Sequence, residues 1–405
     1  MLQIDLSDLP VASSETARHL NRRLILNLIR DKQPISRADL ARLSGLQRST
    51  VSLITEQLIE DRWVVDGTTG RLPRGRRPTL LLLNQRRRII CIDIRPKRTF
   101  MGVSDVNGVF SLQESVPTAP DPDRAIRQVI SRIRPLLKTR TEDPFEGIGI
   151  SLPGRVDYAT QQLIFAPNLK WPPADLKTPI ERETGLEVAL ENAANACALA
   201  EIWFDRTNTI RNLVTVTVSE GIGTGIIADG RLLRGAHGMA GELGHFPLDP
   251  DGPLCGCGKR GCWEILASNH AAIRYYFESA GRSTRPRQTD LEFKALLSMA
   301  DQGDTLAIKA LDKMATQLAR GVRVIVAALD PEAILFVGDF TTAWSRFEGH
   351  LQSEVQQQKL SQVPVSLIPA RDGELSRLRG SVALVLYKHF GVSLPGQSSS
   401  VKASR

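Results

Sequence analysis

Three of the five cysteines of this 405-residue chain fall within eight residues, and this grouping limits the local fold more than any other feature. The segment reads Cys255-Gly-Cys257-Gly-Lys-Arg-Gly-Cys262, and nine residues separate its first cysteine from His245. Three thiolates and one imidazole are the ligand set of a closed tetrahedral zinc site. The glycines give the tight backbone that wrapping one ion requires. We expect His245, Cys255, Cys257 and Cys262 to bind Zn²⁺.

The expected zinc would be structural, because four protein ligands leave no position open for water. The alternative is a buried histidine with core or disulfide-bonded cysteines. Disulfides between such near neighbours are strained, so the metal site is the favoured interpretation. The other two cysteines, Cys91 and Cys197, lie in apolar segments and are expected in the core.

Two glutamates, Glu242 and Glu264, lie at the two ends of the zinc segment. Carboxylates held by a rigid loop accept hydrogen bonds from neighbouring hydroxyl groups, which is the polar pattern that a sugar presents. A single acidic residue is more often solvated surface, so spacing alone leaves the sugar role open.

The run Gly-Glu242-Leu-Gly-His245, followed by the three cysteines and Trp263-Glu264, resembles the signature of the ROK family of bacterial sugar kinases and sugar-responsive repressors. The similarity continues through most of residues 89–390. It implies that the histidine and the cysteines bind zinc, and that Glu242 and Glu264 contact sugar hydroxyl groups. It also implies that His245 approaches the sugar.

A chain of 405 residues is expected to form two or three domains, and its composition is that of a globular protein. Apolar residues make up 42% of the chain and charged residues 24%. No stretch is apolar for long enough to span a membrane, and the acidic N-terminus lacks the basic-then-apolar pattern of a secretion signal. With thiolate zinc ligands, which suit a reducing compartment, these features predict a cytoplasmic protein.

The net charge of +8 is concentrated near the N-terminus. Residues 16–90 contain 16 Lys and Arg against 6 Asp and Glu, an excess larger than that of the whole chain. A nucleic-acid partner is therefore expected to bind this region.

The same region has the pattern of a helix-turn-helix. Apolar residues recur at helical spacing in a first helix that ends near Asp31, a short second helix over Arg37–Ser44 and a third over Gln47–Glu60. Ser36 with Asp39 resembles a capping box that opens the second helix. The third helix is expected to enter the major groove of double-stranded DNA and to contact it through Gln47, Arg48, Ser49, Thr50 and Ser52.

A wing is expected after the third helix. Trp63–Val65 and Thr79–Leu83 have the pattern of two strands, and the loop between them carries arginines on a Gly and Pro backbone. Such arginines suit a narrow minor groove, although arginine runs are often only solvated. The combination predicts a winged helix-turn-helix, which ROK repressors carry in this position, with DNA contacts from Arg71, Arg74, Arg76 and Arg77.

Beyond residue 88, apolar strands alternate with helices, which indicates an α/β fold. The resemblance makes this specific: two actin-like (ribonuclease H-like) lobes of the ROK sugar-kinase fold, with a sugar cleft between them. The clearest strands are expected at Ile89–Ile94, Phe145–Leu152, Leu213–Val218 and Ala333–Val337, and the clearest helices at Arg124–Leu137, Asn192–Phe204 and Leu306–Leu329.

The expected domain division follows from these elements. The winged helix-turn-helix covers residues 15–84 and a basic linker covers 85–88. The first lobe covers 89–191 together with about 377–392, and the second lobe, with the zinc loop, covers 192–376. The Ser-rich segment 393–405 is expected to be disordered.

Three elements of ROK kinase chemistry are altered in this chain. ROK kinases carry Asp-x-Gly-Gly-Thr against the ATP phosphates, where this chain has Asp93-Ile-Arg-Pro. They carry Asn-Asp, whose Asp is the general base, where this chain has Asn192-Ala193. A Gly-Gly near the adenosine pocket reads Gly338-Asp. Only the turn at 221–225 still resembles a phosphate loop, and its glycines also suit a plain strand connection. We expect no catalytic residues and no enzyme activity.

The positions that contact sugar in the family are better retained. The resemblance carries this role to Gly154, Arg155, Asn168, Asn192, Glu242, His245 and Glu264. A chain that keeps sugar ligands and lacks the base can hold a sugar without phosphorylating it. We therefore expect a repressor of sugar uptake or catabolism genes that binds operator DNA as a homodimer or tetramer and senses a sugar or sugar phosphate.

Two alternatives stay open at this point. The cleft is vestigial and a protein partner controls the regulator, or a residual kinase activity remains, against which Ala193 argues. The identity of the sugar, its role as inducer or co-repressor, and the operator sequence do not follow from the sequence.

Overall fold

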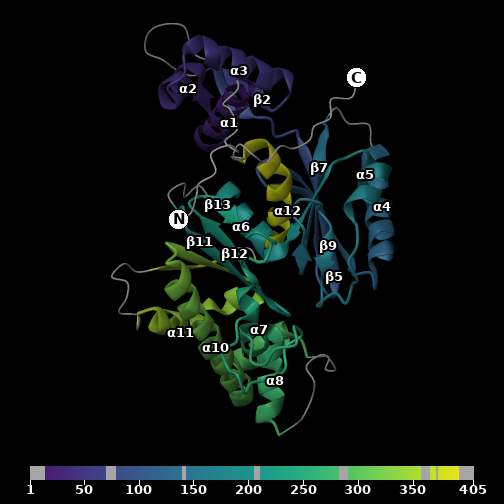
Figure 1. The fold of residues 1–405 in the computed structure, drawn as a ribbon, viewed down its shortest axis with the longest axis vertical. Coiled ribbons are helices and arrows are strands. Elements are labelled where there is room, and N and C mark those ends of the chain that lie inside the picture. The colour runs from purple at the N-terminus through teal and green to yellow at the C-terminus, as the bar shows by residue number, and fades with distance from the viewer. Residues whose placement is uncertain are drawn as a thin grey trace, which may run out of the picture. The chain divides into compact units, whose positions relative to one another are not determined.

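The computed structural model describes residues 14–69, 79–138, 143–204, 210–281, 291–356, 365–370 and 373–391 (Figure 1). The chain divides into two compact units, of which unit 1 comprises Met1–Arg87 with Leu386–Arg405 and unit 2 comprises Arg88–Val385. The segment expected to be disordered, 393–405, lies outside the described residues, as does most of the predicted wing loop.

Unit 1 contains the three predicted helices, α1 (Ser14–Lys32), α2 (Arg37–Ser44) and α3 (Arg48–Glu60). Ser36 caps α2, because its hydroxyl oxygen accepts a hydrogen bond from the Asp39 amide at 3.1 Å and its hydroxyl lies 2.7 Å from the Asp39 carboxylate. The predicted capping box is thus confirmed with Asp in place of Glu. Gly45 ends α2 with φ at 71°, a conformation that favours glycine.

Three short strands complete the winged helix-turn-helix. They are β1 (Ile35–Ser36), β2 (Val64–Thr69) and β3 (Thr79–Leu83), and they form an antiparallel sheet in the order β1-β3-β2. Strands β2 and β3 are the two predicted wing strands. The core between helices and sheet consists of fully buried apolar side chains, among them Ile25, Ile29, Leu40, Val51, Leu58 and Leu81.

The C-terminal helix α12 (Gly373–Phe390) belongs to unit 2 up to Val385 and to unit 1 from Leu386. Its last turn packs on Trp63, whose ring centroid lies 4.6 Å from that of His389 and 5.4 Å from that of Phe390. The guanidinium of Arg87 lies 4.1 Å from the same ring centroid. The contacts thus group the end of α12 with the winged helix-turn-helix, whereas residues 377–392 were expected in the first lobe.

The first sheet of unit 2 contains β4 (Arg88–Ile94), β5 (Arg98–Asp105), β6 (Phe110–Pro117), β7 (Phe145–Leu152) and β10 (Val188–Asn192). Its spatial order is β10-β7-β4-β5-β6. Strands β4, β5 and β6 pair antiparallel, and β7 and β10 add in parallel beside β4. Helices α4 (Pro122–Lys138) and α5 (Lys177–Thr184) contribute buried side chains to the core of this lobe.

The second sheet repeats this plan with β11 (Leu213–Val218), β12 (Ile222–Ala228), β13 (Arg231–Leu233), β14 (Ala333–Val337) and β15 (Ser366–Pro369). Its order is β13-β12-β11-β14-β15, again with three antiparallel strands followed by two parallel ones. Two lobes with the same strand order confirm the predicted two-lobed, ribonuclease H-like fold.

Helices pack on these sheets and position the connecting loops. The first lobe leads into α6 (Ala193–Phe204), and the second contains α8 (Asn269–Ser279), α9 (Phe293–Asp301), α10 (Thr305–Leu329) and α11 (Trp344–Gln356). Cys91 and Cys197 are buried as expected, and burial raises the pKa of Cys197 to about 12. Among the described residues no helix has the length and apolarity that crossing a bilayer requires.

Candidate functional site

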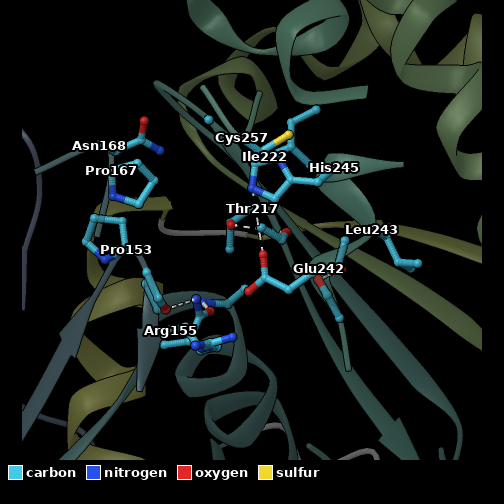
Figure 2. A pocket seen from close by; sticks show the side chains of 18 of the residues that line it. Pro153, Arg155, Pro167, Asn168, Thr217, Ile222, Glu242, Leu243, His245 and Cys257 are labelled. Carbon is cyan, nitrogen blue, oxygen red and sulfur yellow. Dashed lines mark hydrogen bonds and ion pairs between the residues drawn. The ribbon is translucent and has the colours of Figure 1, made fainter. Parts of the chain in front are cut away.

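A cavity of about 670 Å³ lies in unit 2 and is lined from both lobes (Figure 2). Its volume falls within the roughly 300–1,000 Å³ that is common for small-molecule sites. Six of the seven residues predicted to contact sugar line this cavity: Gly154, Arg155, Asn168, Asn192, Glu242 and His245. The fold thus brings together residues that are nearly a hundred positions apart in the sequence.

On the first-lobe side, Asn192 ends β10 next to the end of the parallel strand β7. Its Nδ2 donates a hydrogen bond to the Gly154 carbonyl at 2.7 Å, and its Oδ1 accepts one from the Ala194 amide at 2.8 Å. Asn192 therefore fixes the turn at Gly154 and caps α6. Gly154 has φ at 129°, and a Cβ there would lie 2.3 Å from the carbonyl oxygen of Phe165, so this turn requires glycine.

On the second-lobe side, Glu242 and His245 lie on the short 3₁₀ helix η1 (Glu242–His245). Gly241, with φ at 91°, precedes it, and a Cβ at this residue would lie 2.4 Å from the carbonyl oxygen of Thr224. The Thr224 hydroxyl donates a hydrogen bond to the Gly241 carbonyl. These contacts fix η1 against β12 and thereby position both side chains at the cavity.

The two ring nitrogens of His245 face different groups. Nδ1 lies 3.7 Å from Sγ of Cys255, and Nε2 lies 3.8 Å from Oε2 of Glu242. A histidine that binds a metal through one nitrogen commonly offers the other N–H to a carboxylate. The geometry therefore allows His245 to bind a metal and still to orient a residue at the cavity.

The four predicted metal ligands form one cluster, in which the ligand atoms of His245, Cys255, Cys257 and Cys262 all lie within 4.8 Å of one another. The Sγ atoms of Cys257 and Cys262 are 3.6 Å apart, and all three cysteines are free thiols. A tetrahedron with metal–sulfur bonds of about 2.3 Å has edges of about 3.8 Å. The cluster can therefore hold a tetrahedral metal ion, and its donor set fits zinc.

The end of the metal loop is anchored in the core of the second lobe. Trp263 follows the last cysteine, is 1% exposed, and donates a hydrogen bond from Nε1 to the Gln317 carbonyl at 3.1 Å. A Cβ at Gly321 would lie 1.9 Å from the Trp263 ring, so α10 needs glycine there for the indole to fit. The loop is thus held at its far end independently of any ion.

Glu264 is not among the described residues that line the cavity. Its Oε2 accepts a hydrogen bond from the Ile222 amide at 3.2 Å, and its Oε1 lies 3.9 Å from Sγ of Cys255. A Cβ at Gly221 would lie 2.2 Å from Oε2 of Glu264 and 3.0 Å from Nδ2 of Asn168. In this structure Glu264 joins the metal loop to the turn before β12, and its contact with a sugar stays a prediction.

The first altered kinase element contains a network of buried charges. Asp93 is fully buried, and its carboxylate accepts hydrogen bonds from Nε of Arg95 at 2.6 Å, from Nε and Nη2 of Arg377 at 3.1 and 3.3 Å, and from the Ser151 hydroxyl at 2.9 Å. Burial alone would raise the pKa of Asp93, but the charge of Arg377 and then that of Arg95 outweigh it and hold the pKa below its usual value. Two guanidinium groups therefore share one carboxylate.

The other altered elements have structural explanations. Ala193 lines the cavity at the position of the family's general base. In the glycine-rich turn, a Cβ at Gly223 would lie 3.1 Å from Cβ of Ala194, and one at Gly225 would lie 2.4 Å from the Ala194 carbonyl oxygen. These glycines let β12 approach α6 closely, so the turn needs no phosphate to explain its composition.

The predicted DNA-contacting residues of α3 lie at its N-terminal end. Gln47 precedes the helix as its N-cap, and Gln47, Arg48 and Ser49 are exposed, whereas Thr50 and Ser52 are partly buried. The predicted wing contacts Arg71, Arg74, Arg76 and Arg77 lie outside the described residues. The described part of this surface is compatible with the prediction and does not test it.

Several lining residues were not found by sequence reasoning. Arg377 lines the cavity from α12, a helix that the sequence pattern did not predict. Phe165, Met239 and Phe246 also line it. Phe246 directly follows His245, which was the only available sequence signal, because an exposed apolar side chain has no pattern of its own.

Comparisons with known proteins agree with this architecture. The chain matches the ROK family over residues 89–388 and a winged helix-turn-helix DNA-binding family over residues 18–65. It is 30% identical over 395 residues to the xylose repressor of Bacillus subtilis, an alignment that covers 94% of this chain and 98% of the repressor.

Solved structures give the same result. A ROK family transcriptional regulator described as a homologue of the E. coli MLC protein superposes with a TM-score of 0.79 at 26% identity, covering 92% of this chain and 98% of that one. A ROK glucokinase from Streptomyces griseus, in complex with glucose and AMPPNP, has a TM-score of 0.66 at 27% identity and covers 73% of this chain and 98% of its own. The chain belongs to the ROK family and carries a winged helix-turn-helix ahead of its two ROK lobes.

Proposed function

We propose that the chain is a sequence-specific transcriptional regulator, most simply a repressor, whose ROK unit binds a sugar without phosphorylating it. One observation supports this most directly: a single cavity combines the retained sugar positions with Ala193 at the position of the general base. Alanine cannot accept the proton of the acceptor hydroxyl, and loss of a general base lowers a rate about 10²–10⁴-fold.

The charges at Asp93 support the same conclusion. Its carboxylate is occupied by Arg95, Arg377 and Ser151, so in this proposal it serves as a counter-ion within the fold. Pro96 lines the cavity and has no backbone N–H to offer a phosphate. Phosphoryl transfer depends on donors and charges placed around the phosphates, which this loop no longer provides.

The proposed metal is a structural Zn²⁺ held by His245, Cys255, Cys257 and Cys262. When bound, it would supply a rigid four-coordinate anchor for the loop and no chemistry of its own. His245 would bind it through Nδ1 and turn Nε2 toward Glu242, which fixes that carboxylate at the cavity. Glu264 would keep the preceding turn in place through the Ile222 amide. Sugar hydroxyl groups would then donate to Glu242 and contact Asn168 and Asn192.

The proposed DNA site is the exposed N-terminal end of α3, with the wing arginines in the minor groove. A homodimer or tetramer would present two such units to a palindromic operator. The similarity to the xylose repressor favours a repressor of sugar genes and a neutral pentose or hexose unit in the effector. Sugar would favour one arrangement of the two lobes, and it shifts the equilibrium only by its difference in affinity for the two arrangements. The proposed compartment is the cytoplasm, where operator DNA lies.

Isothermal titration calorimetry of the zinc-loaded protein against pentoses, hexoses, N-acetylated amino sugars and their phosphates tests this proposal. We expect saturable binding of one sugar class, lost in Glu242→Ala and unchanged in Asp251→Ala, an exposed carboxylate near the metal loop. The sugar that binds should also change operator affinity in a gel-shift assay. Absence of binding by folded, DNA-binding protein would refute the sensor role and favour control by a protein partner.

A further inference from the structure

Three large apolar side chains on the wall of the cavity remain about half exposed. Phe165 is 50% exposed, Met239 49% and Phe246 46%. Large apolar side chains gathered at a cavity are a common sign of a binding surface. We call these three residues the apolar collar.

The collar includes residues of both lobes. Phe165 is on β9 (Leu163–Phe165) and pairs with Arg155 on β8 (Arg155–Val156). Nη1 of Arg155 lies 3.1 Å from Sδ of Met239, which connects the first-lobe side of the collar to the loop before η1. Phe246 immediately follows η1. The collar is therefore adjacent to the residues proposed to bind sugar.

Figure 2 shows Arg155 and His245, the neighbours of two collar residues, beside the same cavity as Glu242 and Asn168. The polar groups that are proposed to bind hydroxyls are few, and this number suits a single sugar ring. A cavity of about 670 Å³ has room for more than one ring. A monosaccharide bound at the polar groups would leave the collar in contact with water.

The surroundings of the collar match one face of a second sugar ring. A pyranose presents C–H groups on its ring faces, and these pack against aromatic and thioether surfaces, because burial of apolar area is favourable. The further lining includes the apolar side chains Pro153, Ile164, Pro167, Leu243 and Pro247, together with the polar side chains Thr217, Ser219, Glu220, Thr224, Lys259 and Arg377. A second ring would place one apolar face on the collar, and its hydroxyl edge would face solvent or these polar side chains.

We propose that the apolar collar is a second sugar subsite and that the effector is a neutral disaccharide. This inference rests on the proposed function. The first ring binds at Asn168, Asn192 and Glu242, and the second ring packs on Phe165 and Phe246.

The test is calorimetry with a monosaccharide, its disaccharides and its aryl glycosides on the full-length, zinc-loaded protein. We expect a disaccharide to bind at least about ten-fold more tightly than the monosaccharide, which corresponds to about 1.4 kcal/mol. Phe165→Ala and Phe246→Ala should each lower disaccharide affinity by about ten-fold and leave monosaccharide affinity within about two-fold. Phe246→Tyr should retain the disaccharide affinity, because it keeps the ring.

Leu112→Ala is the matched control, because Leu112 is 42% exposed on β6 and does not belong to the described lining. All variants are checked for folding by circular dichroism. If monosaccharide and disaccharide bind equally and the alanine variants change neither, the collar is not a subsite while the proposed function stands. If the aryl glycoside alone binds tightly, a sugar ring is the wrong occupant. If wild type binds no sugar at all, the proposed function fails and this inference with it.

Discussion

Replacing either partner of the buried Asp93–Arg377 pair should destabilise unit 2, and by different amounts. Arg377→Met removes two hydrogen bonds to a charged group, at 3.1 and 3.3 Å, but leaves Asp93 bonded to Arg95 at 2.6 Å and to Ser151 at 2.9 Å. Hydrogen bonds to charged groups contribute about 1.5–3 kcal/mol each, and relief of repulsion between the two guanidiniums offsets part of the loss, so we expect about 2–3 kcal/mol.

Asp93→Asn is expected to cost more. It removes the single carboxylate that Arg95 and Arg377 share, and leaves the buried guanidinium of Arg377 without this counter-charge, for which about 3–5 kcal/mol is typical. The double variant Asp93→Asn/Arg377→Met should recover part of that loss, because it removes the buried charge together with its partner.

Differential scanning calorimetry at pH 7 measures these losses as downward shifts of the unfolding temperature relative to wild type. A second prediction of the same network concerns pH. The pKa of Asp93 is lower in the folded protein than its ordinary value of 3.8, so its contribution is complete above that value and is lost as pH falls through the folded pKa. If Arg377→Met destabilises more than Asp93→Asn, the shared carboxylate is not the basis of the network.

Three further predictions concern the metal, the general-base position and the DNA surface. Cys257→Ser should lower the zinc stoichiometry and weaken the response of operator binding to sugar. Operator affinity without sugar should stay within about two-fold of wild type, because α3 lies in the other unit. A normal response to sugar would exclude the anchoring role of the metal. Ala193→Asp should not produce ADP release in a coupled assay, because Asp93 stays bonded to Arg377, and measurable turnover would contradict this. Arg48→Ala should weaken binding to the specific operator by about 1–3 kcal/mol more than to random DNA, whereas an equal loss would make Arg48 a phosphate contact.

Much of the fold could be predicted because its central strands are continuous apolar runs. The strands at Phe145–Leu152, Leu213–Val218 and Ala333–Val337 have the bounds that were expected. Because such strands are buried on both faces, they need no alternation of apolar and polar residues, and turn residues mark their ends. The edge strand β6 was missed, because Phe110–Pro117 mixes exposed polar residues with few apolar ones.

The C-terminal helix could not be found in the same way. Its buried positions include Arg377 and Ser381, which are polar residues satisfied by groups more than 200 positions away in the sequence. The repeat of apolar residues at helical spacing is therefore interrupted where the helix is most deeply buried. Polar residues of the cavity could be named from the family resemblance. The place of the half-exposed Phe165 and Met239 at the cavity depends on how the two lobes meet, which local sequence patterns do not encode.

The grouping of Leu386–Arg405 with Met1–Arg87 also has a consequence during translation. A ribosome makes Trp63 early and its packing partners His389 and Phe390 only after all of Arg88–Val385. At about 5–20 residues per second, the 298 residues of Arg88–Val385 take about 15–60 s to synthesise. During this time the nascent winged helix-turn-helix lacks the packing of His389 and Phe390 on Trp63. A chain that stops before Leu386 would keep α3 but never complete that packing. Completion of the winged helix-turn-helix is thereby tied to synthesis of the two ROK lobes.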